Sequence, residues 1–319
     1  MRAFPLPEIL RFCEKNRPMT EIRSYCLTLA NRQSWEVLPA TSAENLAHGL
    51  AAVLNIGPSR TSTQHRLIFT CQAPERTGDS LWRAPDDVAD ICGPIPRPGW
   101  RKEDLGRFWI LSHPEAREVI CYIDGRNAGN TIMPQMWKAL IPVYLRAQRA
   151  GGLVAHAALL ALHGNGVLLV GPSGMGKSTC ARRLGLPWRA LCDDEVLVVP
   201  VTEGNYHCHP LPTWSDLFAP HVRRSWDVEE HVSLKAVCFL ERSEENRIEP
   251  MGQGQAAILI NKSLQTMSTR PDYCLSAEEQ HGVRRASFAN ACKLVASAPS
   301  FRLRAGLTTR YWEMIEEVL

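Results

Sequence analysis

The chain has 319 residues, of which 45 % are hydrophobic and 22 % charged, as in ordinary globular proteins with a sizeable core. Its 36 basic and 33 acidic residues leave a net charge of +3, which argues against a broad nucleic-acid or membrane surface. The apolar runs are too short for a signal peptide or a membrane-spanning helix, so we expect a cytoplasmic protein.

The first regular elements predict an α+β arrangement. Two extended runs, at residues 25–29 and 34–38, are separated by Ala-Asn-Arg-Gln, which indicates a hairpin. Ser42 is a candidate N-cap, and the apolar residues that follow it have the spacing of an amphipathic helix. Residues 66–70 then predict a short strand.

Between residues 74 and 100 the chain carries five prolines and no apolar period, which predicts a long loop or linker between two regular regions. Residues 108–111 and 119–123 predict a pair of strands. A helix over 136–149 should end at Gly151-Gly152, where glycine accommodates a left-handed cap. We therefore expect an N-terminal domain over 1–130 and a second domain over 131–319.

A second hairpin is predicted from the extended run 154–162 and the residues that follow it. Asn-Gly suits a type I′ turn, so either Asn165-Gly166 or Gly164-Asn165 should form the turn, with the strand 167–170 antiparallel to the first. Counting pairs from these turns places His156 opposite residue 175 or 173. His156 would then lie beside the loop after the strand, although a histidine in an apolar run is commonly a core residue.

That loop, residues 171–178, reads Gly-Pro-Ser-Gly-Met-Gly-Lys-Ser and follows a buried strand, which is the P-loop (Walker A) pattern for triphosphates. The glycines let backbone N–H groups point at phosphate oxygens, Lys177 adds a charge, and Ser178 offers a hydroxyl to Mg²⁺. The predicted nucleotide-binding residues are Gly171, Ser173, Gly174, Met175, Gly176, Lys177, Ser178 and Thr179. Because such a loop contacts only phosphates, ATP, GTP and pyrophosphate all remain open.

A short helix over 179–184 precedes an apolar run, 188–199, that is interrupted by Asp193-Asp194-Glu195. Burying such acids is costly without a partner, and Mg²⁺ beside phosphates would provide one. One aspartate would bind the metal while the other accepts the proton of an attacking hydroxyl. The alternative is a solvated acidic turn.

At the end of the chain, the alternating pattern of residues 301–305 predicts a half-buried strand, and residues 309–319 are predicted to form a terminal helix.

Eleven cysteines are scattered along the chain without a Cys-x-x-Cys pair, which argues against a zinc ribbon or an iron–sulfur site. The run His207-Cys208-His209 is unfavourable for a metal, because neighbouring residues of a strand point to opposite faces. We expect most of the cysteines to be reduced core residues.

His156 stands 15 residues before Gly171, and Asp193 stands 16 residues after Lys177. Together with the loop, this pattern over about residues 140–199 resembles the HPr kinase/phosphorylase family. The resemblance implies a mixed sheet flanked by helices, a possible homo-oligomer, and transfer of phosphate from ATP with Mg²⁺ to a serine hydroxyl. It also implies that Asp193 is the base, that His156 orients Asp193, and that Asp194 and Ser178 bind Mg²⁺. The phosphorylase-linked motif Glu-Ile-Arg-Gly-x-Gly has only an echo at 249–254 that lacks the arginine, so phosphorylase activity is not expected.

Four further segments, at residues 151–153, 188–195, 212–216 and 252–257, resemble the SynChlorMet cassette protein ScmC family. That resemblance implies a protein that acts beside radical-SAM enzymes and a PqqD-like protein on a ribosomal precursor peptide. The leading hypothesis is therefore a peptide or protein serine kinase, in which the domain over 1–130 helps to recognise the substrate and the domain over 131–319 binds the nucleotide. The alternatives are a nucleotide-responsive peptide-binding module with little catalysis, and a kinase of a small-molecule hydroxyl. Trp214 is expected either to stack on adenine or to pack in a core.

Overall fold

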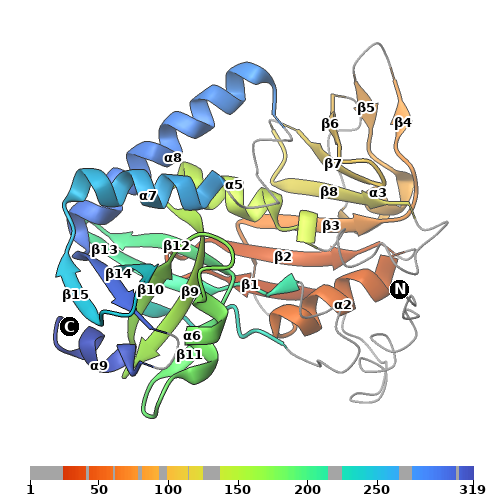
Figure 1. Cartoon of the computed structure of the whole chain (residues 1–319). Coiled ribbons are helices and arrows are strands. Elements are labelled where there is room, and N and C mark those ends of the chain that lie inside the picture. The colour runs from red at the N-terminus through yellow and green to blue at the C-terminus, as the bar shows by residue number, and fades with distance from the viewer. Residues whose placement is uncertain are drawn as a thin grey trace. The chain divides into compact units, whose positions relative to one another are not determined.

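The computed structural model of the chain describes residues 24–40, 43–59, 62–77, 81–92, 99–113, 115–124, 137–214, 225–265, 275–306 and 309–319 (Figure 1). The chain forms two compact units. The first comprises residues 1–28, 32–142 and 214–225, and the second comprises 29–31, 143–213 and 226–319. Both units combine strands with helices, which confirms the predicted α/β class. The predicted domain boundary at residue 130 lies outside the described residues.

The first unit is built on a six-stranded sheet with the order β1-β2-β3-β8-β7-β6. The predicted hairpin β1–β2 and the predicted strand pair β7–β8 are both present and antiparallel, whereas β2, β3 and β8 run parallel to one another. Helix α2 (Glu44–Leu54) connects β2 to β3, and its predicted N-cap, Ser42, lies outside the described residues. The strands are β1 (Tyr25–Thr28), β2 (Ser34–Pro39), β3 (His65–Thr70), β6 (Arg101–Asp104), β7 (Phe108–Ser112) and β8 (Glu118–Ile123).

The predicted long loop or linker over residues 74–100 does not divide two regular regions, because this segment is an insertion within one sheet. It contains β4 (Glu75–Arg76), β5 (Trp82–Arg83) and α3 (Asp86–Cys92), while β3 and β8 pair side by side across it. Val88 and Trp100 are fully buried in a cluster with residues of β3, β7 and β8. A few large side chains therefore anchor the segment without producing an apolar period. Three of its prolines, Pro94, Pro96 and Pro98, lie outside the described residues.

The second unit is built on an eight-stranded sheet with the order β10-β9-β12-β13-β14-β16-β15, and β11 adds to β9. Strand β10 also pairs in parallel with β14, so it lies between β9 and β14. This central position explains its unbroken apolar run, since such a strand is buried on both faces. The strands are β9 (Leu153–Leu162), β10 (Asn165–Val170), β11 (Arg189–Cys192), β12 (Glu195–Thr202), β13 (Asn205–Pro210), β14 (Val232–Arg242), β15 (Arg247–Pro250) and β16 (Ser300–Ala305).

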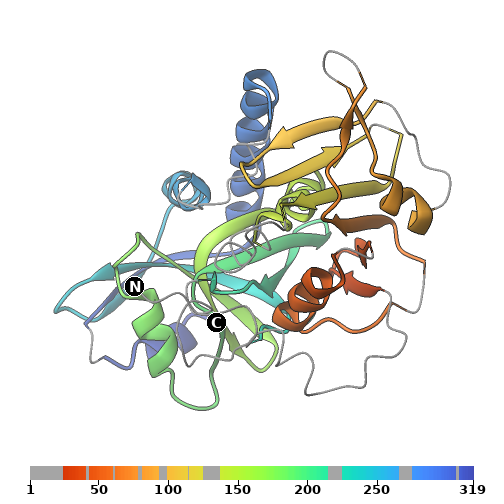
Figure 2. The same cartoon turned by 90° about the vertical axis from the view of Figure 1, so that its right-hand side faces the viewer.

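Helices lie on both sides of this second sheet. Figures 1 and 2 show α7 (Gln253–Gln265) and α8 (Ala277–Ser297) on one side, and α6 (Lys177–Arg183) and α9 (Tyr311–Glu316) on the other. Helix α8 begins with a capping box, in which Ser276 accepts from the Glu279 N–H and the Glu279 carboxylate accepts from Ser276. Helix α5 (Ile141–Arg149) is followed by Gly151 in the left-handed conformation, at φ +92°, as predicted. No helix of the described ranges is both long and apolar enough to cross a bilayer.

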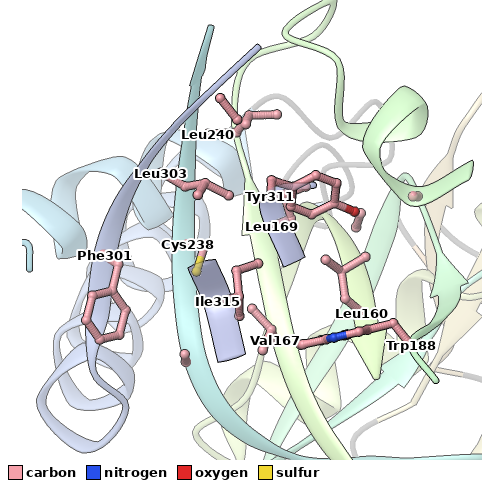
Figure 3. Packing of buried hydrophobic residues seen from close by; sticks show 14 residues of the cluster. Leu160, Val167, Leu169, Trp188, Cys238, Leu240, Phe301, Leu303, Tyr311 and Ile315 are labelled. Atoms are coloured by element: carbon pink, nitrogen blue, oxygen red, sulfur yellow. The ribbon is translucent and has the colours of Figure 1, made fainter. Parts of the chain in front are cut away.

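The core between the sheet and helices α6 and α9 fixes the strand that leads to the candidate site. Val167 and Leu169 of β10 face this core, together with side chains of β14 and β16 (Figure 3). Tyr311 of α9 packs in the same cluster, and its hydroxyl donates to the Cys180 carbonyl of α6 over 2.9 Å. Because α6 follows the 171–178 loop directly, this packing holds one end of the loop while β10 holds the other.

The β9–β10 hairpin is present, but its turn is formed by His163-Gly164 and differs from both predicted turns. Both residues have positive φ, at 50° and 82°, as a type I′ turn requires. Glycine is needed at position 166 for the close packing of the strands, because a Cβ there would lie 2.7 Å from Val232 Cγ2 of the neighbouring β14. The shifted register pairs Ala157 with Val170, so His156 lies just beyond the last pair, next to Gly171.

His209 of β13 is buried and held in one neutral form. Its Nε2 accepts from the Ala30 N–H over 3.0 Å, and its Nδ1 lies 2.7 Å from the Val228 carbonyl oxygen, to which it can only donate. The pKa of His209 is lowered to about 4, mainly by burial and to a smaller extent by the nearby His231 and His207, while the hydrogen bond to the Val228 carbonyl opposes the shift. Protonation of Nε2 would place a second ring proton against the Ala30 N–H and remove this hydrogen bond.

We expect the free energy of unfolding to fall by about 3 kcal/mol as the pH drops from above 6.5 to about 4. The folded pKa of His209 is below the unfolded value, so in this window the unfolded chain takes up a proton that the folded chain does not. Urea unfolding at a series of pH values measures the effect. In His209→Gln this part of the pH dependence should disappear, and an unchanged slope in that variant would contradict the assignment.

Candidate active site

The loop of residues 171–178 connects the end of β10 to the start of α6 and has the backbone that its glycines allow. Gly174 and Gly176 have φ of +79° and +110°, values that residues with a Cβ rarely adopt. The turn is closed by the Met175 N–H, which donates to the Pro172 carbonyl over 3.2 Å. Met175 packs its side chain against the core cluster, whereas Ser173 and Gly174 are exposed at the tip. The loop therefore presents backbone to solvent while its own core contact anchors it.

Lys177 is buried against this loop, with a side chain that has lost most of its water. Its Nζ donates to the Gly171 carbonyl over 2.8 Å and to the Pro172 carbonyl over 3.3 Å. A third contact joins Nζ to His156 Nε2 at 2.9 Å. Desolvation lowers the pKa of Lys177, and the charges of Asp194 and Asp193 oppose this shift. A desolvated cation in range of two carboxylates is thus held directly at the loop.

His156 connects Lys177 to an aspartate. It lies on β9 opposite Glu195, and its Nδ1 is 3.0 Å from Asp194 Oδ1. An ammonium group can only donate, so Nε2 accepts from Lys177 and the ring proton sits on Nδ1, where it is donated to Asp194. The three side chains form one hydrogen-bonded line, Lys177–His156–Asp194.

The acidic triplet lies at the break between β11 and β12, and its three side chains have different surroundings. Asp194 is one-third exposed and contacts His156. Asp193 is buried and accepts a hydrogen bond from the Thr213 hydroxyl over 2.6 Å. Glu195 is also buried, and its charge adds to the burial that raises the pKa of Tyr144. The alternative interpretation, a solvated acidic turn, is therefore wrong for two of the three acids.

The structure corrects one contact that the family resemblance implies. His156 was expected to orient Asp193, but its Nδ1 reaches Asp194 instead. The backbone explains the choice, because the Ala157 N–H donates to the Asp194 carbonyl over 3.0 Å and sets Asp194 next to the neighbouring His156. Asp193 turns the other way, toward Thr213.

Thr213 is the residue of the site that the sequence analysis missed. Its segment, 212–216, carries part of the family resemblance, yet no spacing rule joins residue 213 to residue 193. The adjacent Trp214 is 4 % exposed and stacks on Trp137 at a centroid distance of 6.5 Å, so it packs as a core residue rather than offering a face to adenine.

The donor set suits Mg²⁺ bound together with phosphates. Ser178 and Asp194 supply oxygen atoms, which Mg²⁺ prefers, and Asp194 keeps its second oxygen outside the contact with His156. Among the described residues, no three His, Cys, Asp or Glu side chains converge as a metal cage. A magnesium ion that is held by one carboxylate, one hydroxyl and substrate phosphates needs no such cage.

Sequence comparison places most of this chain in a described family. A family model with the description "SynChlorMet cassette protein ScmC" matches residues 119–319, which include every residue of the candidate site. A search of curated proteins finds no match.

Proposed function

We propose that this chain, which belongs to the SynChlorMet cassette protein ScmC family, is an ATP-dependent kinase for a serine hydroxyl of a peptide or protein. The family description refers to a cassette, which supports a substrate that is encoded with the protein. A ribosomal precursor peptide, modified by radical-SAM and PqqD-like partners, would be such a substrate. Beyond the α/β class, the proposal includes a P-loop fold like that of HPr kinases.

The observation that carries the proposal is the line Lys177–His156–Asp194 at the loop, with Asp193 beside it. A lysine that serves only the fold has little reason to be buried against two backbone carbonyls with its pKa lowered. In a phosphotransferase the same group supplies positive charge at the transferred phosphate. The arrangement therefore fits phosphoryl transfer better than a structural ion pair.

Each residue would have a separate task. Lys177, with the backbone of residues 171–176 and the side chains of Ser178 and Thr179, would bind the phosphates. Asp194 and Ser178 would hold Mg²⁺, which neutralises phosphate charge when bound. Asp193 would accept the proton of the acceptor hydroxyl. His156 would keep Asp194 in place and donate to it from Nδ1.

The test is incubation of the full chain with Mg·ATP and synthetic peptides encoded in the same cassette, followed by mass spectrometry. We expect one phosphoryl group on a serine. Parallel reactions with Mg·GTP and pyrophosphate determine the phosphate donor. Tight Mg·ATP binding without transfer to any peptide would favour the nucleotide-responsive binding module, and transfer to a free hydroxy amino acid would favour a small-molecule kinase.

A further inference from the structure

We infer that Thr213 is a positioning residue for the proposed base, and that it holds the Asp193 carboxylate so that one oxygen stays available for the acceptor's proton. The inference rests on the proposed kinase function. Its basis is the 2.6 Å hydrogen bond from Thr213 Oγ1 to Asp193 Oδ1.

Asp193 precedes the β12–β13 hairpin and Thr213 follows it, and the backbone pairing of the two strands brings these residues together. Strand β12 pairs with β13 as far as Val196 and Pro210. The Leu211 N–H then donates to the Glu195 carbonyl over 3.0 Å, which extends the pairing one step beyond the strands. Residue 213 thereby returns alongside residue 193, so the position of the hydroxyl is set by the sheet and not by a mobile loop.

Burial makes this hydrogen bond decisive for the direction of the carboxylate. Asp193 and Thr213 are 6 % and 5 % exposed, so little water is available to replace the hydroxyl. The χ2 torsion of aspartate has a broad energy profile, and its two oxygens exchange easily without a fixed partner. The Thr213 hydroxyl has one proton, which it donates to Asp193 Oδ1, so Oδ2 is the oxygen that can accept the proton of the acceptor.

The neighbouring carboxylate is held by a different donor. Asp194 receives its hydrogen bond from His156 Nδ1, whereas Asp193 receives one from Thr213. The two adjacent acids thus have distinct orientations before any ligand binds. This separation lets one of them serve the metal and the other the proton without exchanging tasks.

The chain offers a matched control in the first unit. Thr70 is fully buried, and its hydroxyl donates to both carboxylate oxygens of Asp87, at 3.0 and 2.8 Å. Replacing Thr70 by valine also removes a hydrogen bond from a buried threonine to an aspartate, although Asp87 is only half-buried. Thr70→Val therefore controls for the loss of such a bond away from the site, and its kinetic effects should differ from those of Thr213→Val.

The experiment compares wild type, Thr213→Val, Thr213→Ser and Thr70→Val in phosphoryl transfer from Mg·ATP to the cassette peptide. Thr213→Val should lower kcat on the order of 10- to 100-fold, because a misdirected base reacts poorly. Its KM for peptide and its affinity for Mg·ATP should stay within about twofold of wild type, since Thr213 contributes to neither binding step. Thr213→Ser keeps the hydroxyl and should recover most of kcat. If Thr213→Val does not fold, Thr213→Ala replaces it.

The possible failures are distinguishable. Wild type that transfers phosphate, with Thr213→Val as active as Thr70→Val, would overturn the positioning role and leave the kinase function intact. The same conclusion follows if Thr213→Ser is as slow as Thr213→Val. A phosphate found on Thr213 itself would make it an acceptor and also overturn the proposal. A wild-type protein that transfers phosphate to no peptide would overturn both.

Discussion

Asp193→Asn is expected to lower kcat for phosphoryl transfer about 10²- to 10⁴-fold, the usual contribution of a general base. Asparagine has nearly the shape of aspartate and can still accept from Thr213, so the fold and the binding of Mg·ATP should be preserved. What it loses is the ability to take up the acceptor's proton. Initial rates with the cassette peptide, together with calorimetric titration by Mg·ATP, separate these two effects.

The control for this change is Asp87→Asn, which alters a half-buried carboxylate that also accepts from a threonine. We expect its kcat to equal that of wild type. If Asp193→Asn retained more than about one-tenth of wild-type kcat, Asp193 could not be the base. Asp194→Asn should behave differently from Asp193→Asn, because it would raise the Mg²⁺ concentration needed for half-maximal rate.

Lys177→Met is expected to weaken binding of Mg·ATP about 10- to 100-fold, since a hydrogen bond to a charged group contributes on the order of 1.5–3 kcal/mol. Methionine fills a similar volume without the charge, so the loop should keep its path. Titration with a fluorescent ATP analogue measures the loss. Lys102→Met is the control, because Lys102 is also a shielded lysine, 14 % exposed, and pairs with Asp104 over 2.9 Å in the first unit.

The same lysine predicts a pH dependence. Desolvation lowers its pKa below the usual 10.5, so Lys177 loses its charge at a lower pH than an ordinary lysine. The affinity for Mg·ATP should therefore decline on the alkaline side, beginning below pH 10.5, and Lys177→Met should lack this decline. An alkaline limb that persists in Lys177→Met would show that another group is responsible.

The β9–β10 hairpin illustrates how far local sequence signals reach. The extended run and the Asn-Gly turn signal predict two antiparallel strands before the loop, and these are present. The turn residues were predicted wrongly, because Gly166 is required by the close approach of Val232 on β14 rather than by the turn. A contact between strands about 66 residues apart is invisible to a rule that considers four consecutive residues. The error moved the expected partner of His156 by two to four positions.

The prediction for residues 74–100 was wrong for a related reason. Proline content and the lack of a period indicated a linker, whereas β3 and β8 are adjacent strands of one sheet. Burial of Val88 and Trp100 depends on residues of the four strands β2, β3, β7 and β8, so no periodic pattern within the segment indicates it. In this part of the chain, tertiary packing outweighed the local signal.

By itself, the sequence determined most of the chemical groups of the candidate site and where along the chain they fall, but not Thr213. The loop after a buried strand, Lys177, Ser178 and the aspartates at a strand break are local patterns whose physical reasons act over a few residues. Only the tertiary structure decided how these groups pair, with His156 on Asp194 and Thr213 on Asp193. Such pairings depend on sheet register and on backbone hydrogen bonds between distant segments, which a one-dimensional pattern does not contain.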